Sequence, residues 1–292
     1  MAISLTTTET LIASPGLMRR LSRNLSGMVG LVIVIVFVVI AILGALGITP
    51  YPSVEQHMTN RLKAPSSAFL MGTDLFGRDI TSRVMEGAGN SFKVAFISVT
   101  ISSVIGITLG MISGFAGGQV DNFIMRFMDI FFAFPSLLLA LVVVTVMGPG
   151  LIQTALAIAV VYTPIFARVA RGPVLAAKER EFVLAARCLG MRPARILLRH
   201  IFPNTLAPII VQISLALSWS LLTEAALSFL GLGTQPPAAS WGVMLSEGRS
   251  LAEKAPWLIL FPGLAIMLGV LGFNLLGDGL RDILDPRMRG TR

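Results

Sequence analysis

The sequence EFVLAARCLGMRPARILLRHIFPN occupies residues 181–204, between two long apolar segments. Gly190 can take the left-handed conformation that ends a helix. Pro193 suits the first turn of a following helix, and Pro203 is expected to stop that second helix. The stretch therefore predicts a short helix, a break and a second short helix. Its basic side chains are Arg187, Arg192, Arg195, Arg199 and His200.

The composition around this stretch is that of a membrane protein. Hydrophobic residues make up 54% of the chain, charged residues only 13%, and the mean hydropathy is +0.82. A soluble domain has about 25% charged residues. Lone strands cannot satisfy their backbone groups in lipid, so the fold class is predicted as an all-α polytopic membrane protein. The net charge of +8 is attributed to inner loops that face anionic lipid, and no nucleic-acid partner is expected.

Apolar segments of about 20 residues predict six transmembrane helices. Their ranges are 28–48, 91–115, 124–147, 151–169, 206–230 and 257–279. The first is longer than a signal-peptide core of about 7–15 residues, so it is interpreted as a retained helix. The predicted organisation is an N-terminal cytoplasmic tail (1–27), a first helix (28–48), an outer segment (49–90), a core of further membrane helices (91–280) and a cytoplasmic tail (281–292). The core includes a cytoplasmic loop (170–205) and an outer segment (231–256).

The distribution of basic residues predicts the orientation. With the N-terminus inside, the outer segments hold only Arg61, Lys63, Arg78, Arg83, Lys93, Arg249 and Lys254 of the 23 lysines and arginines. Since basic residues concentrate on the cytoplasmic side, both termini and the 181–204 stretch are expected in the cytoplasm.

Prolines and closely spaced glycines punctuate the predicted helices. The prolines are Pro135, Pro164, Pro208 and Pro262, and Gly106 and Gly110 are four residues apart. Small residues let helices approach closely, which is one interpretation of this pattern. The other is that the prolines create kinks at which helices bend during gating.

Charged residues within the predicted helices are few. Asp129 could pair with Arg126 three residues earlier, or simply lie at a solvated helix end. Glu224 lies deeper, so it must face the bundle, a water-filled path or a partner subunit. A structural hydrogen bond and a contact with substrate both remain open for Glu224.

The chain lacks the residue patterns that a membrane-embedded hydrolase needs, namely a nucleophile and a base within reach of each other. Its two histidines, His57 and His200, are expected on opposite sides of the membrane, so no nucleophile–base pair is apparent. No spacing suggests a metal site, and no phosphate-binding glycine-rich loop occurs. The chain is therefore predicted not to be an enzyme, and energy from ATP would have to come from a partner. The lone Cys188 allows no internal disulfide.

A polar stretch, GTDLFGRDITSR, occupies residues 72–83 of the first outer segment. Thr73, Asp74 and Asp79 can accept backbone hydrogen bonds, which would make the stretch a pair of capped turns. The alternative is a docking surface for another protein, with Asp74, Arg78 and Asp79 as contacts.

Together these stretches resemble the integral-membrane permeases of bacterial ABC importers, specifically the C-permease of the dipeptide/oligopeptide/nickel group. The resemblance rests on 185–204, on 72–83, on Glu224 to Gly233 followed by Ser240-Trp241-Gly242, and on the tail from Gly277 to Arg287. It implies a type I importer permease fold in the bacterial cytoplasmic membrane. It also implies a sister permease, two ATPase subunits that hold ATP and Mg²⁺, and an extracytoplasmic substrate-binding protein, with no cofactor on this chain.

The resemblance implies that residues 181–204 form a coupling helix that docks on an ATPase subunit. The candidate coupling residues are Glu181, Ala185, Ala186, Arg187, Gly190, Arg195 and Pro203. The family usually has a glutamate where this chain has Leu184, so no individual salt bridge is assigned. Short peptides are the expected substrate, while nickel, glutathione, opines and oligosaccharides remain alternatives. A self-sufficient secondary transporter is the competing class, although no internal repeat is found.

Overall fold

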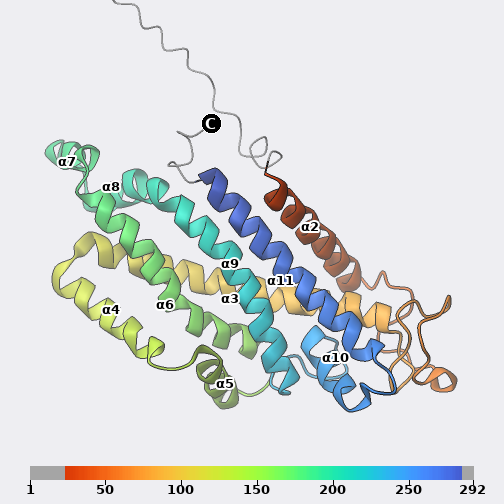
Figure 1. The fold of residues 1–292 in the computed structure, drawn as a ribbon. Helices are drawn as coiled ribbons and strands as arrows, with labels where there is room; N and C mark the ends of the chain where they lie inside the picture. Colours follow the sequence, from red (N-terminus) through yellow and green to blue (C-terminus); the bar gives the residue numbers. More distant parts are fainter. Residues whose placement is uncertain (1–23, 285–292) are drawn as a thin grey trace, which may run out of the picture.

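A computed structural model describes residues 24–284 of the chain, and the described part is an assembly of helices (Figure 1). The long helices are α2 (Leu25–Ala45), α3 (Ile80–Ala116), α6 (Leu151–Lys178), α9 (Phe202–Phe229) and α11 (Trp257–Leu284). The shorter ones are α4 (Gly118–Phe132), α5 (Ser136–Met147), α7 (Glu181–Cys188), α8 (Pro193–Ile196) and α10 (Trp241–Gly248), with single turns at Met58–Asn60, Leu197–Ile201 and Arg249–Leu251. The expected all-helical fold class is confirmed.

The predicted third membrane helix, 124–147, is not one straight helix. It consists of α4 and α5, which are bent by 89° across a short break. Pro135 lies at this break and N-caps α5, because a proline has no N–H to donate and disfavours helical geometry in the residue before it. The chain is therefore bent at Pro135, whereas Pro164, Pro208 and Pro262 lie inside continuous helices. Bending at any of these prolines during gating stays a prediction. Within residues 24–284, five helices are long and apolar enough to cross a membrane, or six if the bent pair counts as one span.

Several helices extend beyond the apolar segments that predicted them. Helix α3 begins at Ile80 rather than near residue 91, and α6 continues to Lys178 rather than ending near 169. Hydropathy marks only the part of a helix that lies in hydrocarbon, while the backbone hydrogen bonds continue into polar sequence. The sides of the membrane assigned to the segments stay predictions. The tail residues 1–23 and 285–292, with their basic side chains, lie outside the described part.

Helices α3 and α6 form the centre of the bundle. A Cβ atom at Gly110 would lie 2.2 Å from the carbonyl oxygen of Ala167, and one at Gly106 would lie 2.5 Å from that of Thr163. Any larger residue at these positions would force the two backbones apart. The packing interpretation of this glycine pair is therefore confirmed.

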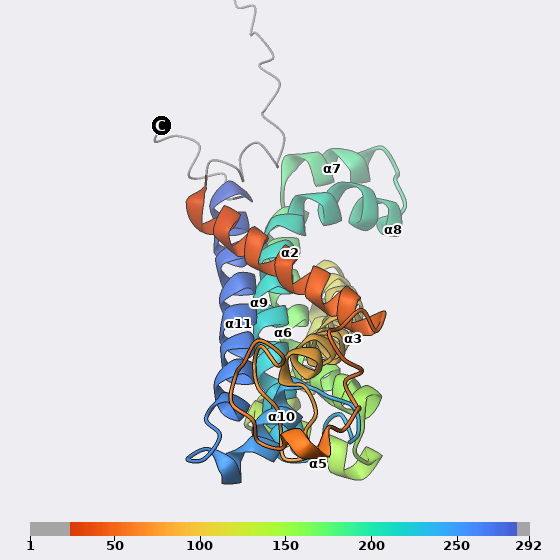
Figure 2. The ribbon, with the colours of Figure 1, turned by 90° about the vertical axis from the view of Figure 1, so that its right-hand side faces the viewer.

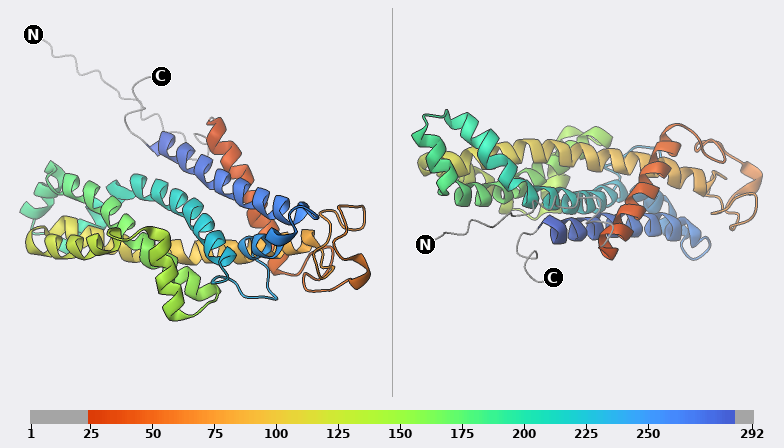
Figure 3. Two further views of the ribbon diagram at one scale, coloured as in Figure 1. Left: turned by 60° about the horizontal axis from the view of Figure 1, so that its bottom comes forward. Right: turned by 90° about the horizontal axis from the view of Figure 1, so that it is seen from above.

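Helix α2 crosses the bundle diagonally and rests on α11 and α3 (Figures 2 and 3). Its Gly30 faces the backbone of Leu276, where an added Cβ would lie 2.4 Å from the nitrogen, and its Gly44 faces the carbonyl of Met85. The N-cap residue Asn24 also donates a hydrogen bond to Asp282 at 2.9 Å. These contacts attach the first membrane helix to the rest of the fold.

The two ends of the bundle differ in construction. One end carries the hairpin of α7 and α8, and the opposite end carries the loop 46–79 together with α10 (Figure 2). Trp241 anchors α10, since its buried ring packs against Phe37 and Phe92 and its Nε1 donates to the Val84 carbonyl at 3.0 Å. Each end is thus fixed to the membrane helices by contacts of its own.

Candidate functional site

The hairpin at residues 181–201 is built by a regular helix-ending motif. Gly190 has φ of +71°, its N–H donates to the Arg187 carbonyl, and the Met191 N–H donates to the Ala186 carbonyl at 3.1 Å. This pair of bonds is the Schellman arrangement, which satisfies the last carbonyls of α7. Pro193 then occupies the first turn of α8. The predicted helix, break and helix are confirmed.

The second half of the hairpin does not end at Pro203. Leu197–Ile201 forms one π-helical turn, in which the Phe202 N–H donates to the Leu197 carbonyl, and α9 follows directly. The expectation that Pro203 stops this helix was wrong. Pro203 lies in the first turn of α9, where its missing N–H is tolerated after the wider π turn. The hairpin therefore continues without a loop into a membrane-spanning helix.

One face of the hairpin packs on the ends of the membrane helices. Val183, Ala186, Ile196 and Ile201 are buried in a cluster with Met111 of α3 and with Val174 and Ala177 of α6. Among the candidate coupling residues, Ala186 thus belongs to this inner face. A movement of the hairpin must displace α3, α6 and α9, because close-packed side chains transmit displacement rather than absorb it.

The opposite face of the hairpin is exposed. Glu181, Ala185, Arg187, Gly190 and Arg195 are exposed on the hairpin, and Pro203 is exposed in the first turn of α9. Arg187 is directed toward α3, since its guanidinium carbon lies 5.8 Å from the centre of the Phe115 ring. Phe182, Leu184, Leu189 and Leu198 are also exposed there, Leu189 by 82%. Large apolar side chains exposed in an extramembrane segment mark an interaction surface. Hydropathy alone had not singled out these four residues, because their exposure depends on which side of each helix packs inward.

Two ion pairs connect α4 to α6 beneath the hairpin. Asp121 accepts two bonds from Arg171, at 2.6 and 2.5 Å, and also accepts a hydrogen bond from Ser113. Asp129 pairs with Arg168 at 2.5 Å. The sequence had suggested Arg126 as the partner of Asp129, which was wrong. The three-dimensional approach of α6 places Arg168 within reach instead.

At the other end, the stretch 72–83 forms the capped turns considered from sequence. Asp74 Oδ1 accepts from the N–H groups of Phe76 and Arg78, and Asp79 Oδ2 accepts from Ser82. Thr73 Oγ1 accepts from the Lys63 N–H at 2.9 Å. Asp74, Arg78 and Asp79 are all buried, so they do not form an exposed docking surface in this structure.

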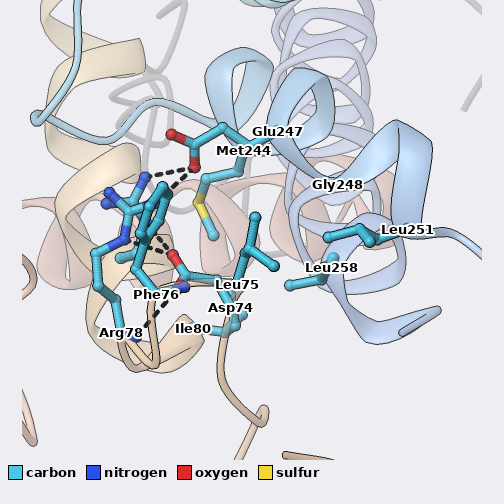
Figure 4. Close-up of a pocket in the computed structure, with 11 residues that line it drawn as sticks. Asp74, Leu75, Phe76, Arg78, Ile80, Met244, Glu247, Gly248, Leu251 and Leu258 are labelled. Atoms are coloured by element: carbon cyan, nitrogen blue, oxygen red, sulfur yellow. Dashed lines mark hydrogen bonds and ion pairs between the residues drawn. The ribbon is translucent and has the colours of Figure 1, made fainter. Parts of the chain in front are cut away.

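Four of the charges at this end form an ion-pair cluster, in which three side chains are buried and that of Glu247 is 32% exposed. Arg78 and Arg83 each bond to the same oxygen of Glu247 in α10, both at 3.0 Å, and Arg78 also pairs with Asp74 at 2.5 Å (Figure 4). Arg83 is only 1% exposed. The cluster borders a pocket of about 160 Å³, whose apolar walls include Leu75, Met244 and Leu258 (Figure 4).

The ion-pair cluster joins the loop 46–79 and the start of α3 to α10. Glu247 was not identified from sequence, because its partners lie 169 and 164 residues away. The only signal in the sequence was that the carboxylate of Glu247 closely follows the mostly apolar residues 241–245. Because the charges of Asp74, Arg78 and Arg83 are buried, they must be paired, so the cluster specifies how the loop 46–79 meets α10.

Comparison with known protein families identifies the family to which this chain belongs. The family model described as "Binding-protein-dependent transport system inner membrane component" matches residues 106–290. The chain belongs to this family. A second model, the N-terminal TM domain of oligopeptide transport permease C, matches residues 16–65. The permease is therefore a multi-pass protein of the bacterial inner membrane.

Curated relatives match the permease over most of its length. The dipeptide transport system permease protein DppC of Alkalihalophilus pseudofirmus is 48% identical over 93% of this chain and 89% of that protein. The di/tripeptide transport system permease protein DppC of Pseudomonas aeruginosa is 44% identical, over 84% and 82%. The glutathione transport system permease protein GsiD of Pectobacterium atrosepticum is 45% identical, over 83% and 81%.

A solved structure supports the fold assignment. A chain of the MetNI methionine ABC transporter superposes with a TM-score of 0.57, covering 68% of the permease and 94% of that chain, at 17% identity. At that identity the likeness establishes the fold alone. The expected ABC importer permease fold is confirmed.

The buried Glu224 belongs to the internal structure of the permease. Its side chain is fully buried, and its Oε1 accepts a hydrogen bond from Ser228 at 2.6 Å. In the same region, a Cβ at Gly242 would lie 2.3 Å from the Ala225 carbonyl, and one at Gly233 would lie 1.8 Å from the Ser228 hydroxyl. Residues 225–242 thus fasten α10 to α9. The second carboxylate oxygen of Glu224 is buried without a hydrogen-bond partner among the described residues, and the role of Glu224 stays a prediction.

Proposed function

We propose that the chain is the permease subunit of an ABC importer that takes up short peptides, working as a heterodimer with a sister permease. Two ATPase subunits, which hold ATP and Mg²⁺, drive it through the hairpin. An extracytoplasmic binding protein delivers the peptide at the end that carries α10. Both termini and the hairpin are cytoplasmic in this arrangement, and catalysis belongs to the partners alone.

The observation that carries the proposal is the two-faced hairpin. Its inner face is packed on α3 and α6, and its second half is continuous with α9. Its outer face presents exposed apolar and basic side chains. A lever that converts a movement of a docked subunit into a movement of membrane helices needs both properties. Glu181, Ala185, Arg187 and Arg195 would contact the ATPase, whereas Gly190 and Ala186 maintain the shape of the hairpin.

The names of the relatives support short peptides as substrates. Those at 48% and 44% identity are named for dipeptide and di/tripeptide transport. The relative at 45% identity is named for glutathione transport. Dipeptides, tripeptides and glutathione are all small zwitterionic or anionic molecules with amide bonds and a free carboxylate. This is the substrate class proposed for this chain.

The outer ion-pair cluster is proposed to support the binding-protein contact indirectly. Because Arg78, Asp74 and Asp79 are buried, they would stabilise the loop and α10 rather than touch the partner. Exposed Leu75 and Phe76, on the same turn, would form the contact itself. The same segment would thus form capped turns through its buried charged residues and contact the binding protein through its exposed apolar residues.

The proposal is tested by reconstituting the complete importer in proteoliposomes. The assembly contains this chain, its sister permease, both ATPase subunits and the binding protein, and uptake of radiolabelled alanyl-alanine is measured. Uptake is expected only when ATP, the ATPase subunits and the binding protein are all present. Uptake that continues without ATP or without the ATPase subunits would instead establish a secondary transporter.

A further inference from the structure

A groove lies on the hairpin side of the bundle, between α6, α9 and α11. It has a volume of about 430 Å³. Its walls are Val169 of α6, Ala207, Pro208, Val211, Gln212 and Leu215 of α9, and Arg281 and Leu284 of α11. A mostly apolar groove of a few hundred Å³ with a small number of convergent polar groups has the character of a small-molecule site. The outer pocket, at about 160 Å³, is too small for that role.

The groove carries two polar side chains of defined chemistry. Gln212 is half-buried and offers both an amide donor and an amide acceptor. Arg281 adds a planar cation that matches the geometry of a carboxylate and binds it through two parallel hydrogen bonds. A ligand that satisfies both groups has a carboxylate beside a peptide amide, and apolar side chains to lie against the valine and leucine walls.

The groove also lies at the end of an open stripe along α9. Pro208, Gln212, Leu215, Trp219 and Leu222 recur at spacings of three and four residues, so they share one face of the helix. Each of them is exposed or half-buried, Trp219 by 59%. The stripe runs from the groove toward the half of the helix next to α10. A substrate that moves along this face of α9 reaches the groove last.

The position of the groove on α9 ties it to the hairpin. Ala207 and Pro208 lie within the first two turns of α9, directly after the π turn that joins α9 to α8. A displacement of the hairpin therefore moves one wall of the groove relative to Arg281 on α11. The groove is placed where ATP-driven movement would change its affinity for a ligand.

We propose that this groove is the inner binding site for the transported peptide, in which Arg281 binds the C-terminal carboxylate and Gln212 bonds to the peptide amide. The inference rests on the proposed function, since it takes a short peptide as the substrate. Arg281 and Gln212 then determine specificity at the exit from the membrane, separately from the selection made by the binding protein.

The test compares two substrates in the reconstituted importer, alanyl-alanine and its C-terminal amide. Uptake of each is measured with saturating binding protein for the wild type, Arg281→Gln, Arg281→Lys and the control Arg126→Gln. Arg126 is an exposed arginine on α4 outside the groove, so its variant removes the same charge. The acid-to-amide ratio is the uptake of alanyl-alanine divided by the uptake of its amide. Dividing this ratio for a variant by the wild-type ratio removes the contribution of the binding protein's own preference between the two substrates.

A hydrogen-bonded ion pair with the substrate carboxylate predicts that Arg281→Gln lowers the acid-to-amide ratio about tenfold. Arg281→Lys is expected to lower the acid-to-amide ratio by a smaller factor, and Arg126→Gln is expected to keep the wild-type ratio. ATPase activity stimulated by the binding protein should persist in Arg281→Gln, which shows that the variant is folded and assembled.

The proposal is overturned if Arg281→Gln reduces uptake of both substrates equally, or leaves both unchanged. If the acid-to-amide ratio of Arg281→Gln falls only in vesicles that contain phosphatidylglycerol, and not in pure phosphatidylcholine, Arg281 binds an anionic lipid instead of the peptide. If the wild-type importer takes up neither substrate, the proposed function itself fails. Wild-type uptake with an unchanged ratio in Arg281→Gln rejects the groove alone.

Discussion

The two ends of the permease use arginine in opposite ways. At the hairpin end, Arg187, Arg192 and Arg195 are exposed on a small projecting element. At the other end, Arg78 and Arg83 are buried and paired with Asp74 and Glu247. Exposed charges contribute little to folding but remain available to a partner, whereas buried pairs specify an internal arrangement. The comparison supports the proposed docking role of the hairpin and assigns the buried pairs at the opposite end to the internal structure.

The largest effect is expected from Gly190→Pro in the hairpin. Gly190 has φ of +71° and donates its N–H to Arg187, and proline permits neither. The hairpin should lose its shape, so that ATP-dependent uptake is abolished while membrane insertion persists. Uptake in proteoliposomes and resistance to alkaline extraction measure the two quantities.

The matched control for this change is Gly263→Ala in α11. Gly263 has no atom near an added Cβ and no positive φ, so uptake should be retained. Normal uptake by Gly190→Pro would show that the lever between the ATPase and the membrane helices lies elsewhere.

The next effect concerns stability at the outer end. Arg83→Ala removes one of the two arginines bonded to Glu247, whose side chain is 32% exposed and keeps its bond to Arg78, so the expected cost is about 1–3 kcal/mol. Thermal unfolding of the purified protein in detergent should show a clear fall in Tm. The control is Arg195→Ala on the exposed face of the hairpin, for which Tm should stay the same. Equal falls in Tm for both variants would remove the distinction between the two ends.

A smaller effect is expected from Leu189→Ser at the tip of the hairpin. This side chain is 82% exposed, so its replacement should leave Tm unchanged. If Leu189 is an anchor of the docking surface, the affinity for the ATPase subunit should fall about tenfold. Titration of the ATPase subunit onto permease in nanodiscs measures that affinity. Unaltered binding would exclude Leu189 from the interface.

The smallest effect is expected from Asp129→Asn beneath the hairpin. The ion pair between Asp129 and Arg168 has both side chains about half exposed. Such pairs contribute about 0–1 kcal/mol, so the change in Tm should be near the limit of detection. A loss as large as that of Arg83→Ala would mean that burial does not separate the two classes of ion pair.

Part of the candidate site was predictable because its signals are local. Gly190 and Pro193 specify a helix end and a helix start through their own backbone geometry. The Schellman bonds confirm the first, and the position of Pro193 in the first turn of α8 confirms the second. Asp74 and Asp79 cap turns through bonds to residues a few positions away. Pro203 was misjudged, because a π turn upstream compensates for the missing N–H in a way that a single proline does not reveal.

The sequence by itself determined that the permease is a helical membrane protein with a basic hairpin, since apolar length and backbone chemistry act locally. Only the tertiary structure decided which charges are exposed and which are paired. Glu247 meets Arg78 and Arg83, and Asp129 meets Arg168 rather than Arg126, because helix packing brings together residues far apart in the chain. The same packing leaves Gln212 and Arg281 on one groove. Such pairings depend on distances between helices, and no periodicity within one helix contains that information.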